Sequence, residues 1–188
     1  MRLIFISLLL AAWLTGAPHA EKPILRLDTG GHMGRITDII PLRDGRHIIT
    51  ASDDKTIRIW DAKTGRTVRK ILGQIGPGPV GMIYAIALSP DERTLAVGGA
   101  LHDDLELASA IRLYDFRSGR MIGLLKGHRN VILALSFSPD GSLLASGSGD
   151  RTVKLWDIRA SPPRLITVSY THLRAHETEA DLVCRLLL

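Results

Sequence analysis

Cysteine is almost absent from this 188-residue sequence, and the single one, Cys184, lies close to the C-terminal end. Residues 21–166 contain none. This excludes a disulfide framework from that segment, and it also excludes chemistry that depends on a thiol.

A block of basic residues is also missing. The chain has 24 Lys and Arg against 19 Asp and Glu, a net charge of +5, but the basic residues are dispersed along the sequence. A dedicated nucleic-acid surface would gather them on one face or in one stripe. We therefore expect a protein or peptide partner and no nucleic acid.

Motifs for catalysis and for cofactor binding are missing as well. No Gly-x-Ser-x-Gly elbow is present, and the Gly-Pro-Gly-Pro stretch at 76–79 lacks the lysine of a phosphate-binding loop. A cluster that could ligate a divalent cation, or could be a solvated acidic loop, consists of His102, Asp103, Asp104 and Glu106. Because no Asp-x-Asp-x-Asp-Gly loop is present, we expect a solvated loop and no metal there. Since the motifs for phosphate binding and for a catalytic serine are missing too, we expect no cofactor and no enzyme activity. A hydrolase built without these motifs stays an open alternative.

The most apolar stretch, Leu3 to Leu14, is too short to span a bilayer, which needs roughly 20 residues. Arg2 precedes it, Gly16 and Pro18 would break a helix after it, and a small residue, Ala20, follows. This pattern is typical of a secretory signal peptide over residues 1–20. It predicts a periplasmic or extracellular protein with no membrane span after cleavage. The alternatives are a retained anchor and a buried first helix.

The C-terminal residues resemble translated sequencing-adapter DNA. Residues 168–178 read Val-Ser-Tyr-Thr-His-Leu-Arg-Ala-His-Glu-Thr, which back-translates into the adapter of transposase-based libraries, and the final residues match the fixed sequence beyond it. This predicts a natural sequence that ends near Ile166 and an adapter-derived tail, 167–188, that has no defined packing. The alternative is a C-terminal helix in which His172 and His176 have the spacing of two metal ligands.

Three segments repeat one pattern of short apolar runs separated by turns. The first runs from Gly31-His32 to Trp60-Asp61, and the third from Gly127-His128 to Trp156-Asp157; the second lacks the Gly-His start and ends at Tyr114-Asp115. Alternation with a period of two and the Asp-Gly and Ser-Pro-Asp turns indicate hairpins of β-strands. We expect four antiparallel strands in each segment, with approximate bounds 31–72, 73–126 and 127–166.

These repeats resemble the WD-repeat family of β-propellers. The resemblance implies an all-β fold: three four-stranded antiparallel blades of an incomplete WD-repeat propeller, since complete rings have about four to eight blades. It also implies that four side chains in a blade form a structural hydrogen-bond network. The two implied networks are His32, Thr50, Asp54 and Trp60, and His128, Ser146, Asp150 and Trp156. Because they repeat, we expect these residues to stabilise the blades rather than to catalyse a reaction.

The second segment departs from the family pattern. Gly98 is expected in the Ser/Thr place and Tyr114 in the Trp place. Insertions at 74–82 and 100–109 are expected on one face, because both connections leave an antiparallel blade at the same end. Loops on a rigid scaffold often bind partners. We therefore predict a partner-binding loop that contains the His102–Glu106 cluster.

The expected function is a non-catalytic protein–protein interaction scaffold, exported and part of a larger protein. The resemblance extends to exported bacterial WD-repeat proteins, some of which carry a caspase-like peptidase domain. The alternative is therefore the regulatory propeller of a larger enzyme. Such a peptidase needs a Cys–His pair, and residues 21–166 have no cysteine.

Overall fold

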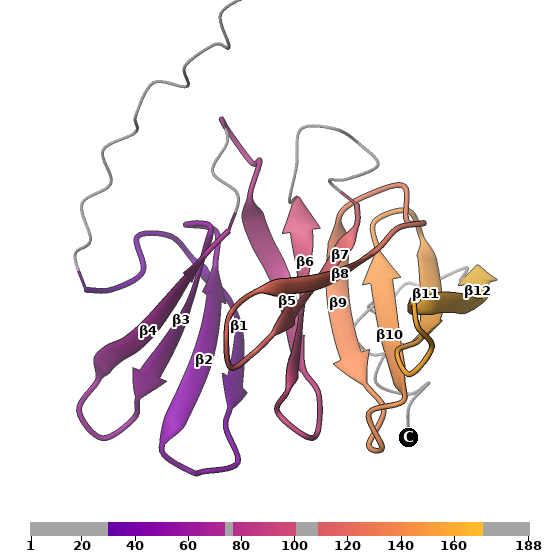
Figure 1. Cartoon of the computed structure of the whole chain (residues 1–188). Helices are drawn as coiled ribbons and strands as arrows, with labels where there is room; N and C mark the ends of the chain where they lie inside the picture. The colour runs from indigo at the N-terminus through magenta and orange to yellow at the C-terminus, as the bar shows by residue number, and fades with distance from the viewer. Residues whose placement is uncertain (1–29, 74–76, 101–108, 171–188) are drawn as a thin grey trace, which may run out of the picture.

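A computed structural model describes residues 30–73, 77–100 and 109–170. Within these ranges every regular element is a β-strand, and the strands form three four-stranded antiparallel sheets, here called blades 1 to 3 (Figure 1). Blade 1 consists of β1 (Ile36–Pro41), β2 (His47–Ser52), β3 (Thr56–Asp61) and β4 (Arg66–Leu72). Blade 2 consists of β5 (Met82–Leu88), β6 (Thr94–Ala100), β7 (Ile111–Asp115) and β8 (Met121–Leu125). Blade 3 consists of β9 (Ile132–Phe137), β10 (Leu143–Ser148), β11 (Thr152–Asp157) and β12 (Arg164–Tyr170).

The Ser-Pro-Asp sequences close the hairpins between the first two strands of blades 2 and 3. The Ser138 hydroxyl donates to Asp140 (2.7 Å) and accepts from the Leu143 backbone N–H (2.9 Å). Ser89 makes the same two contacts in blade 2. Gly141 has a φ of 70°, a left-handed conformation that glycine adopts without steric cost. The turn residues therefore fix where each strand begins and ends.

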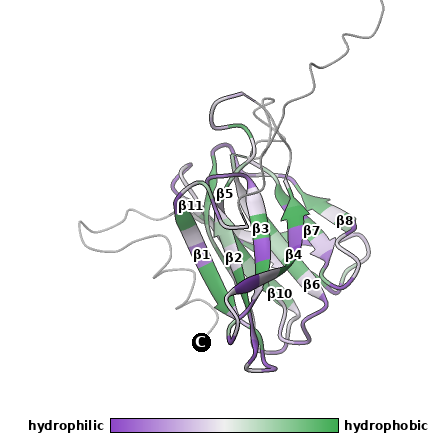
Figure 2. Ribbon diagram, turned by 90° about the vertical axis from the view of Figure 1, so that its left-hand side faces the viewer, coloured by the Kyte–Doolittle hydropathy of each residue, from purple (hydrophilic) through white to green (hydrophobic). Residues whose placement is uncertain are grey.

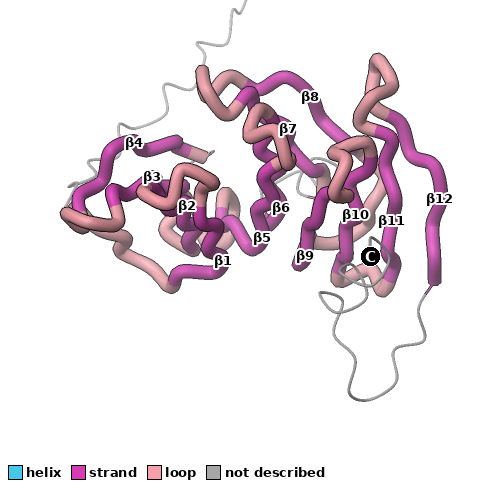
Figure 3. Tube along the Cα trace, turned by 90° about the horizontal axis from the view of Figure 1, so that it is seen from below, coloured by secondary structure: helices cyan, strands magenta, loops and turns pink. Residues whose placement is uncertain are grey.

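The three blades lie side by side, and consecutive blades pack against each other (Figure 1 and Figure 3). Seen from below, β1, β5 and β9 follow one another along one side of the assembly, whereas β4 and β8 lie on the other side (Figure 3). Contacts between β1 and β5 and between β5 and β9 join consecutive blades along this inner side. Each blade thus presents one short strand to the axis around which the blades are arranged.

Apolar side chains fill the two seams between the blades. One cluster lies between blades 1 and 2 and includes Ile49, Ile57, Ile83 and Leu95, all nearly inaccessible to water. The other lies between blades 2 and 3 and surrounds Trp156. Figure 2 shows the hydrophobic colours mainly along the strands, where they are interrupted by hydrophilic segments, as expected when sheet faces are buried against each other.

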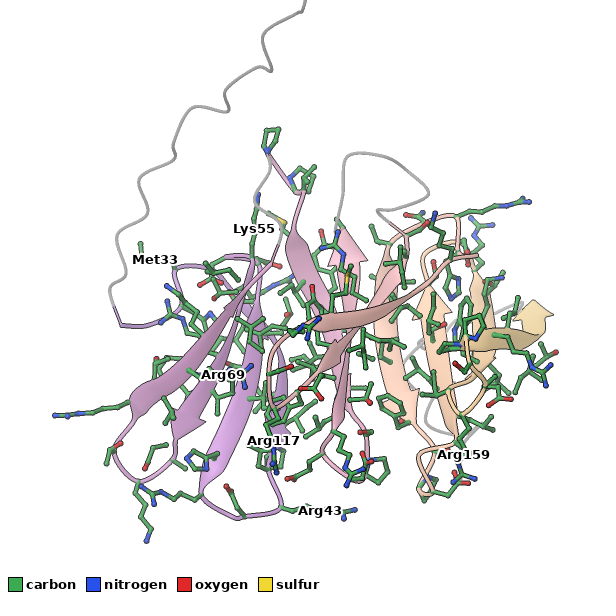
Figure 4. All side chains as sticks on the ribbon, viewed as in Figure 1. Met33, Arg43, Lys55, Arg69, Arg117 and Arg159 are labelled. Carbon is green, nitrogen blue, oxygen red and sulfur yellow. The ribbon has the colours of Figure 1, made fainter. Side chains whose placement is uncertain are left out.

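Polar contacts also cross the seam between blades 1 and 2. One guanidinium nitrogen of Arg69, on β4, donates to the carbonyls of Phe116 (2.7 Å) and Arg117 (3.0 Å) in the turn after β7. Figure 4 shows Arg69 and Arg117 on this side of the molecule. At the lower turns, the Arg43 backbone N–H donates to Glu92 (2.7 Å). These directional contacts fix the relative position of two blades that apolar packing alone would hold less specifically.

The predicted all-β fold with three four-stranded blades is confirmed. The predicted lack of packing after Ile166 is wrong for residues 167–170. They complete β12, in which Thr167 pairs with Leu155 and Tyr170 with Thr152. The reason is physical: the outer edge of β11 offers free backbone groups, and Thr, Val and Tyr favour extended backbone. Residues 171–188, with His172 and His176, lie outside the described residues. That the tail derives from adapter DNA stays a prediction, which the source DNA sequence would test.

Candidate functional site

The four predicted network residues of blade 3 lie in one continuous hydrogen-bonded set. His128 Nδ1 is 3.0 Å from Asp150 Oδ2, and His128 Nε2 is 2.7 Å from the Ser146 hydroxyl. The Trp156 indole N–H donates to the same hydroxyl at 2.8 Å. Sheet pairing brings Ser146 and Trp156 onto adjacent strands, while the turn between β10 and β11 carries Asp150 to the histidine.

The direction of every hydrogen bond in this set follows from the chemistry of its members. An ionised carboxylate only accepts hydrogen bonds, so His128 Nδ1 carries a proton and donates a hydrogen bond to Asp150. The other ring nitrogen of a neutral imidazole then accepts from Ser146, whose oxygen in turn accepts from the indole of Trp156. Donation therefore runs one way, from Trp156 through Ser146 and His128 to Asp150.

Burial and hydrogen bonding shift two pKa values in this set. Burial lowers the pKa of His128 below its usual 6.5 and outweighs the opposing effect of Asp150, which keeps the ring neutral. Burial would raise the pKa of Asp150, but hydrogen bonds hold it to about 2. The carboxylate accepts from the Thr152 hydroxyl (2.6 Å), from the backbone N–H groups of Arg129 (2.8 Å) and Thr152 (2.9 Å), and from His128. A partly buried charge with four donors is satisfied, and such networks rigidify a domain.

Blade 1 repeats this arrangement with the other predicted residues. His32 lies 2.9 Å from Asp54 and 2.6 Å from the Thr50 hydroxyl, which accepts from the Trp60 indole at 2.7 Å. Trp60 is half-buried, whereas only 2% of Trp156 is exposed. The Arg58 guanidinium lies 5.9 Å from the centre of the Trp60 ring, within the range of a cation–π contact.

Blade 2 lacks this set, and the sheet register corrects one prediction about it. Val97 pairs with Arg112, as Thr50 pairs with Arg58 and Ser146 with Lys154. Val97, not Gly98, therefore occupies the Ser/Thr place. The prediction was wrong by one residue, which in a strand means the opposite face. Val97 belongs to the apolar cluster between blades 1 and 2. A hydroxyl at this place would have no indole N–H from which to accept a hydrogen bond, because Tyr114 stands in the place of the tryptophan.

Gly98 lies at the packing interface between blades 2 and 3. A Cβ atom at Gly98 would lie 2.5 Å from Ile132 Cγ2, closer than real Cβ contacts occur. Ile132 is fully buried at the start of β9. The absence of a side chain at Gly98 therefore allows blade 3 to approach blade 2. Sequence analysis missed this role because the contact links residues of different repeats.

The predicted partner-binding loop, with His102, Asp103, Asp104 and Glu106, lies outside the described residues. The described ends of the two insertions are close: the Gly81 N–H donates to the Ala100 carbonyl at 2.6 Å. Both insertions therefore leave blade 2 at the same end. In the described part of the chain, no three His, Cys, Asp or Glu side chains are grouped to hold a metal ion.

A groove that sequence analysis did not predict lies between the outer strand of blade 1 and the lower turns of blade 2. Its lining is Arg69, Asp91, Glu92, Arg93, Asp115, Phe116 and Arg117. Three basic and three acidic side chains balance in it, so the groove gives no preference for a ligand of either charge. Each turn shows these charges in the sequence, but only the packing of two blades brings them together.

The hydrogen-bonded sets and the three four-stranded sheets have the fold of an incomplete WD-repeat β-propeller, as in solved WD40-repeat structures. Residues 22–61 and 119–157 match the family model described as WD domain, G-beta repeat. The solved structure of U3-55K has a TM-score of 0.63 and 26% sequence identity over 76% of this chain and 41% of that chain.

Two curated relatives illustrate the similarity in sequence. The target of rapamycin complex subunit wat1 of Schizosaccharomyces pombe is 34% identical over 60% of this chain and 32% of its own length. A guanine nucleotide-binding protein subunit beta of Oryza sativa is 29% identical over 73% of this chain and 35% of its own length. The chain thus spans about a third of the length of these relatives.

The predicted export of the protein is wrong. The relatives described above, and a further target of rapamycin complex subunit from Arabidopsis thaliana, are eukaryotic proteins and not exported bacterial ones. The prediction depended on residues 1–20, which lie outside the described part of the chain, and a short apolar stretch after a basic residue has low specificity. In the described ranges, no helix has the length and apolar character needed to cross a membrane.

Proposed function

We propose that this protein is a non-catalytic scaffold on which other proteins assemble. The main support is that the side chains best suited to catalysis are fully engaged within their own blades. Both ring nitrogens of His128 have partners, and the Asp150 carboxylate has four donors. A general acid or base must reach the proton it transfers, and these groups instead face each other.

The similarity to known proteins supports the same proposal. The relatives from fission yeast and rice are both named as subunits of larger assemblies. A protein that supplies rigid blades to an assembly needs surface loops and a stable core, but no reactive group. The alternative, a propeller that regulates a caspase-like peptidase, stays a hypothesis because no observation on the described residues favours it.

We place the partner contact on the loops of blade 2, residues 74–82 and 100–109. The support is that both insertions leave the blade at the same end, where Gly81 and Ala100 are hydrogen-bonded. The carboxylates of Asp103, Asp104 and Glu106 would favour a basic partner surface. Their attraction would weaken as salt screens exposed charges.

Affinity capture of partners from the source cells, with quantitative mass spectrometry, tests this proposal. The bait is the whole chain, compared with the double variant Asp103→Lys/Asp104→Lys and with its neutral control Asp103→Asn/Asp104→Asn. We expect stepwise loss of the same partner from the native chain through the neutral to the reversed variant. Equal recovery by all three baits would reject the loop as the contact. A turnover activity of the purified chain would reject the non-catalytic scaffold.

A further inference from the structure

Asp38 is an exception to the repeat. It lies in β1 opposite Ala51, at the ladder position that the other blades fill with alanine: Ala85 opposite Gly98 and Ala134 opposite Gly147. Strand β1 has no other charged residue. A partly buried carboxylate in place of a methyl group is costly unless it has partners, so its contacts indicate its role.

The Asp38 carboxylate joins two blades. One oxygen accepts from the backbone N–H of Ile86 on β5 of blade 2 (3.0 Å), and the other accepts from the N–H of Ile39 in its own strand (2.8 Å). The neighbouring Thr37 hydroxyl donates to the Ile83 carbonyl, also on β5 (2.8 Å). Blade 1 therefore holds the inner strand of blade 2 through two adjacent side chains.

We infer that Asp38 is a proton-sensitive latch between blades 1 and 2. The ionised carboxylate holds the Ile86 amide across the seam, and uptake of a proton releases that hold. The contact is a charge-assisted hydrogen bond, which is roughly twice as strong as a neutral one. A protonated carboxyl group leaves the Ile86 N–H with a weaker acceptor, while the Thr37 contact and the apolar cluster keep the blades together.

The surroundings of Asp38 make it sensitive to protons. Burial raises its pKa above the usual 3.8, and the N–H groups of Ile86 and Ile39 only partly oppose this. The titratable side chains on the strands packed against β1 are His47 on β2 and Tyr84 on β5, and Arg35, just before β1, pairs with Asp53. None of these groups contributes to the shift.

The effect on the seam and the effect on the whole fold have opposite signs. Because the folded-state pKa of Asp38 lies above its unfolded value, the folded chain binds the proton more tightly. Its contribution to the free energy of unfolding therefore increases as pH falls through the raised pKa toward 3.8. Protonation removes a desolvated charge, which stabilises the chain, and at the same time weakens one contact between blades.

NMR titration of backbone amides tests the latch in the whole chain. We expect the Ile86 amide proton to shift upfield with one transition above pH 3.8, and its protection from hydrogen exchange to fall about threefold or more relative to other β5 amides. Leu135 has the equivalent place in blade 3, and the strand that precedes it in the series, β5, has Ala85 in place of Asp38, so Leu135 is the internal control. Its amide should not follow this transition.

Two variants separate the latch from a general effect of acid. Asp38→Ala supplies the residue that the other blades carry, and it should abolish the transition at Ile86. Asp38→Asn keeps an acceptor but cannot titrate, and it should also abolish the transition, so it replaces the alanine variant if that fails to fold. A pH-independent Ile86 amide in the native chain would overturn the inference, and so would a transition that persists in either variant.

Discussion

Replacing Trp156 should destabilise the chain far more than replacing Tyr114. The two residues occupy the same place in their blades, paired with Leu144 and Leu95. Trp156 is 2% exposed and donates to Ser146, whereas Tyr114 is half-buried and has Val97 where the acceptor would be. Core aromatic-to-alanine changes cost about 3–5 kcal/mol, and the lost hydrogen bond adds about 1 kcal/mol for Trp156→Ala. Because Tyr114 is only half-buried, its replacement by alanine should lower the free energy of unfolding by about 2 kcal/mol.

Urea unfolding followed by circular dichroism measures the difference. The free energy of unfolding falls by about 2–3 kcal/mol for each molar increase in urea. Trp156→Ala should therefore lower the urea midpoint by about 2 M, and Tyr114→Ala should lower it by less than about 1 M. Since total stabilities are about 5–15 kcal/mol, the milder Trp156→Phe serves where the alanine variant is unfolded. It removes the N–H donor and part of the ring system but keeps an aromatic group, so it should cost less than the alanine change. Equal midpoints for the Trp156→Ala and Tyr114→Ala variants would show that the hydrogen-bonded set adds nothing to packing.

Three further changes test individual contacts. Ser146→Ala should cost about 1–3 kcal/mol in urea unfolding because the indole and the imidazole lose their shared partner, whereas Ser146→Thr, which supplies the residue of Thr50, should cost less. Because the pKa of His128 is lowered on folding, its contribution is complete above pH 6.5 and is lost below it. The native chain should therefore lose more stability than His128→Gln between about pH 7 and pH 5, and parallel curves would contradict this. Gly98→Ala should lower the thermal midpoint through its clash with Ile132, with a cost of about 1–3 kcal/mol, and Ile132→Ala in the same chain should suppress that penalty, so simple additivity would count against the clash.

Features that repeat could be predicted from the sequence, and features that link different repeats could not. The alternation of apolar residues and the Ser-Pro-Asp turns determine hairpins locally, so the three sheets were predictable. The members of the set around His128 were predicted from the resemblance to the WD-repeat family, which implied the same four places in blade 1. Gly98 was wrongly assigned to the Ser/Thr place because pairing register, rather than residue type, decides which side chain of a strand faces a given neighbouring blade.

Contacts between neighbouring blades have no periodic pattern in the sequence from which they could be predicted. The approach of Ile132 to Gly98 and the donation from Arg69 to Phe116 each join residues of neighbouring repeats that follow no common spacing. Asp38 illustrates the same limit. The sequence shows a charge within an apolar run, but only the packing of β5 identifies its acceptor role toward Ile86.

In the described residues, the side-chain hydrogen bonds that join the four members of each set lie within a single blade. A substitution in one set therefore leaves the other intact, and blades can diverge one at a time. Blade 2 is an example: it has Val97 and Tyr114 in the places of the acceptor and the indole, whereas blades 1 and 3 have the full set. The hydrogen bonds of a set thus belong to one blade, whereas Trp156 also packs in the apolar cluster between blades 2 and 3, so a change there reaches the neighbouring blade through packing alone.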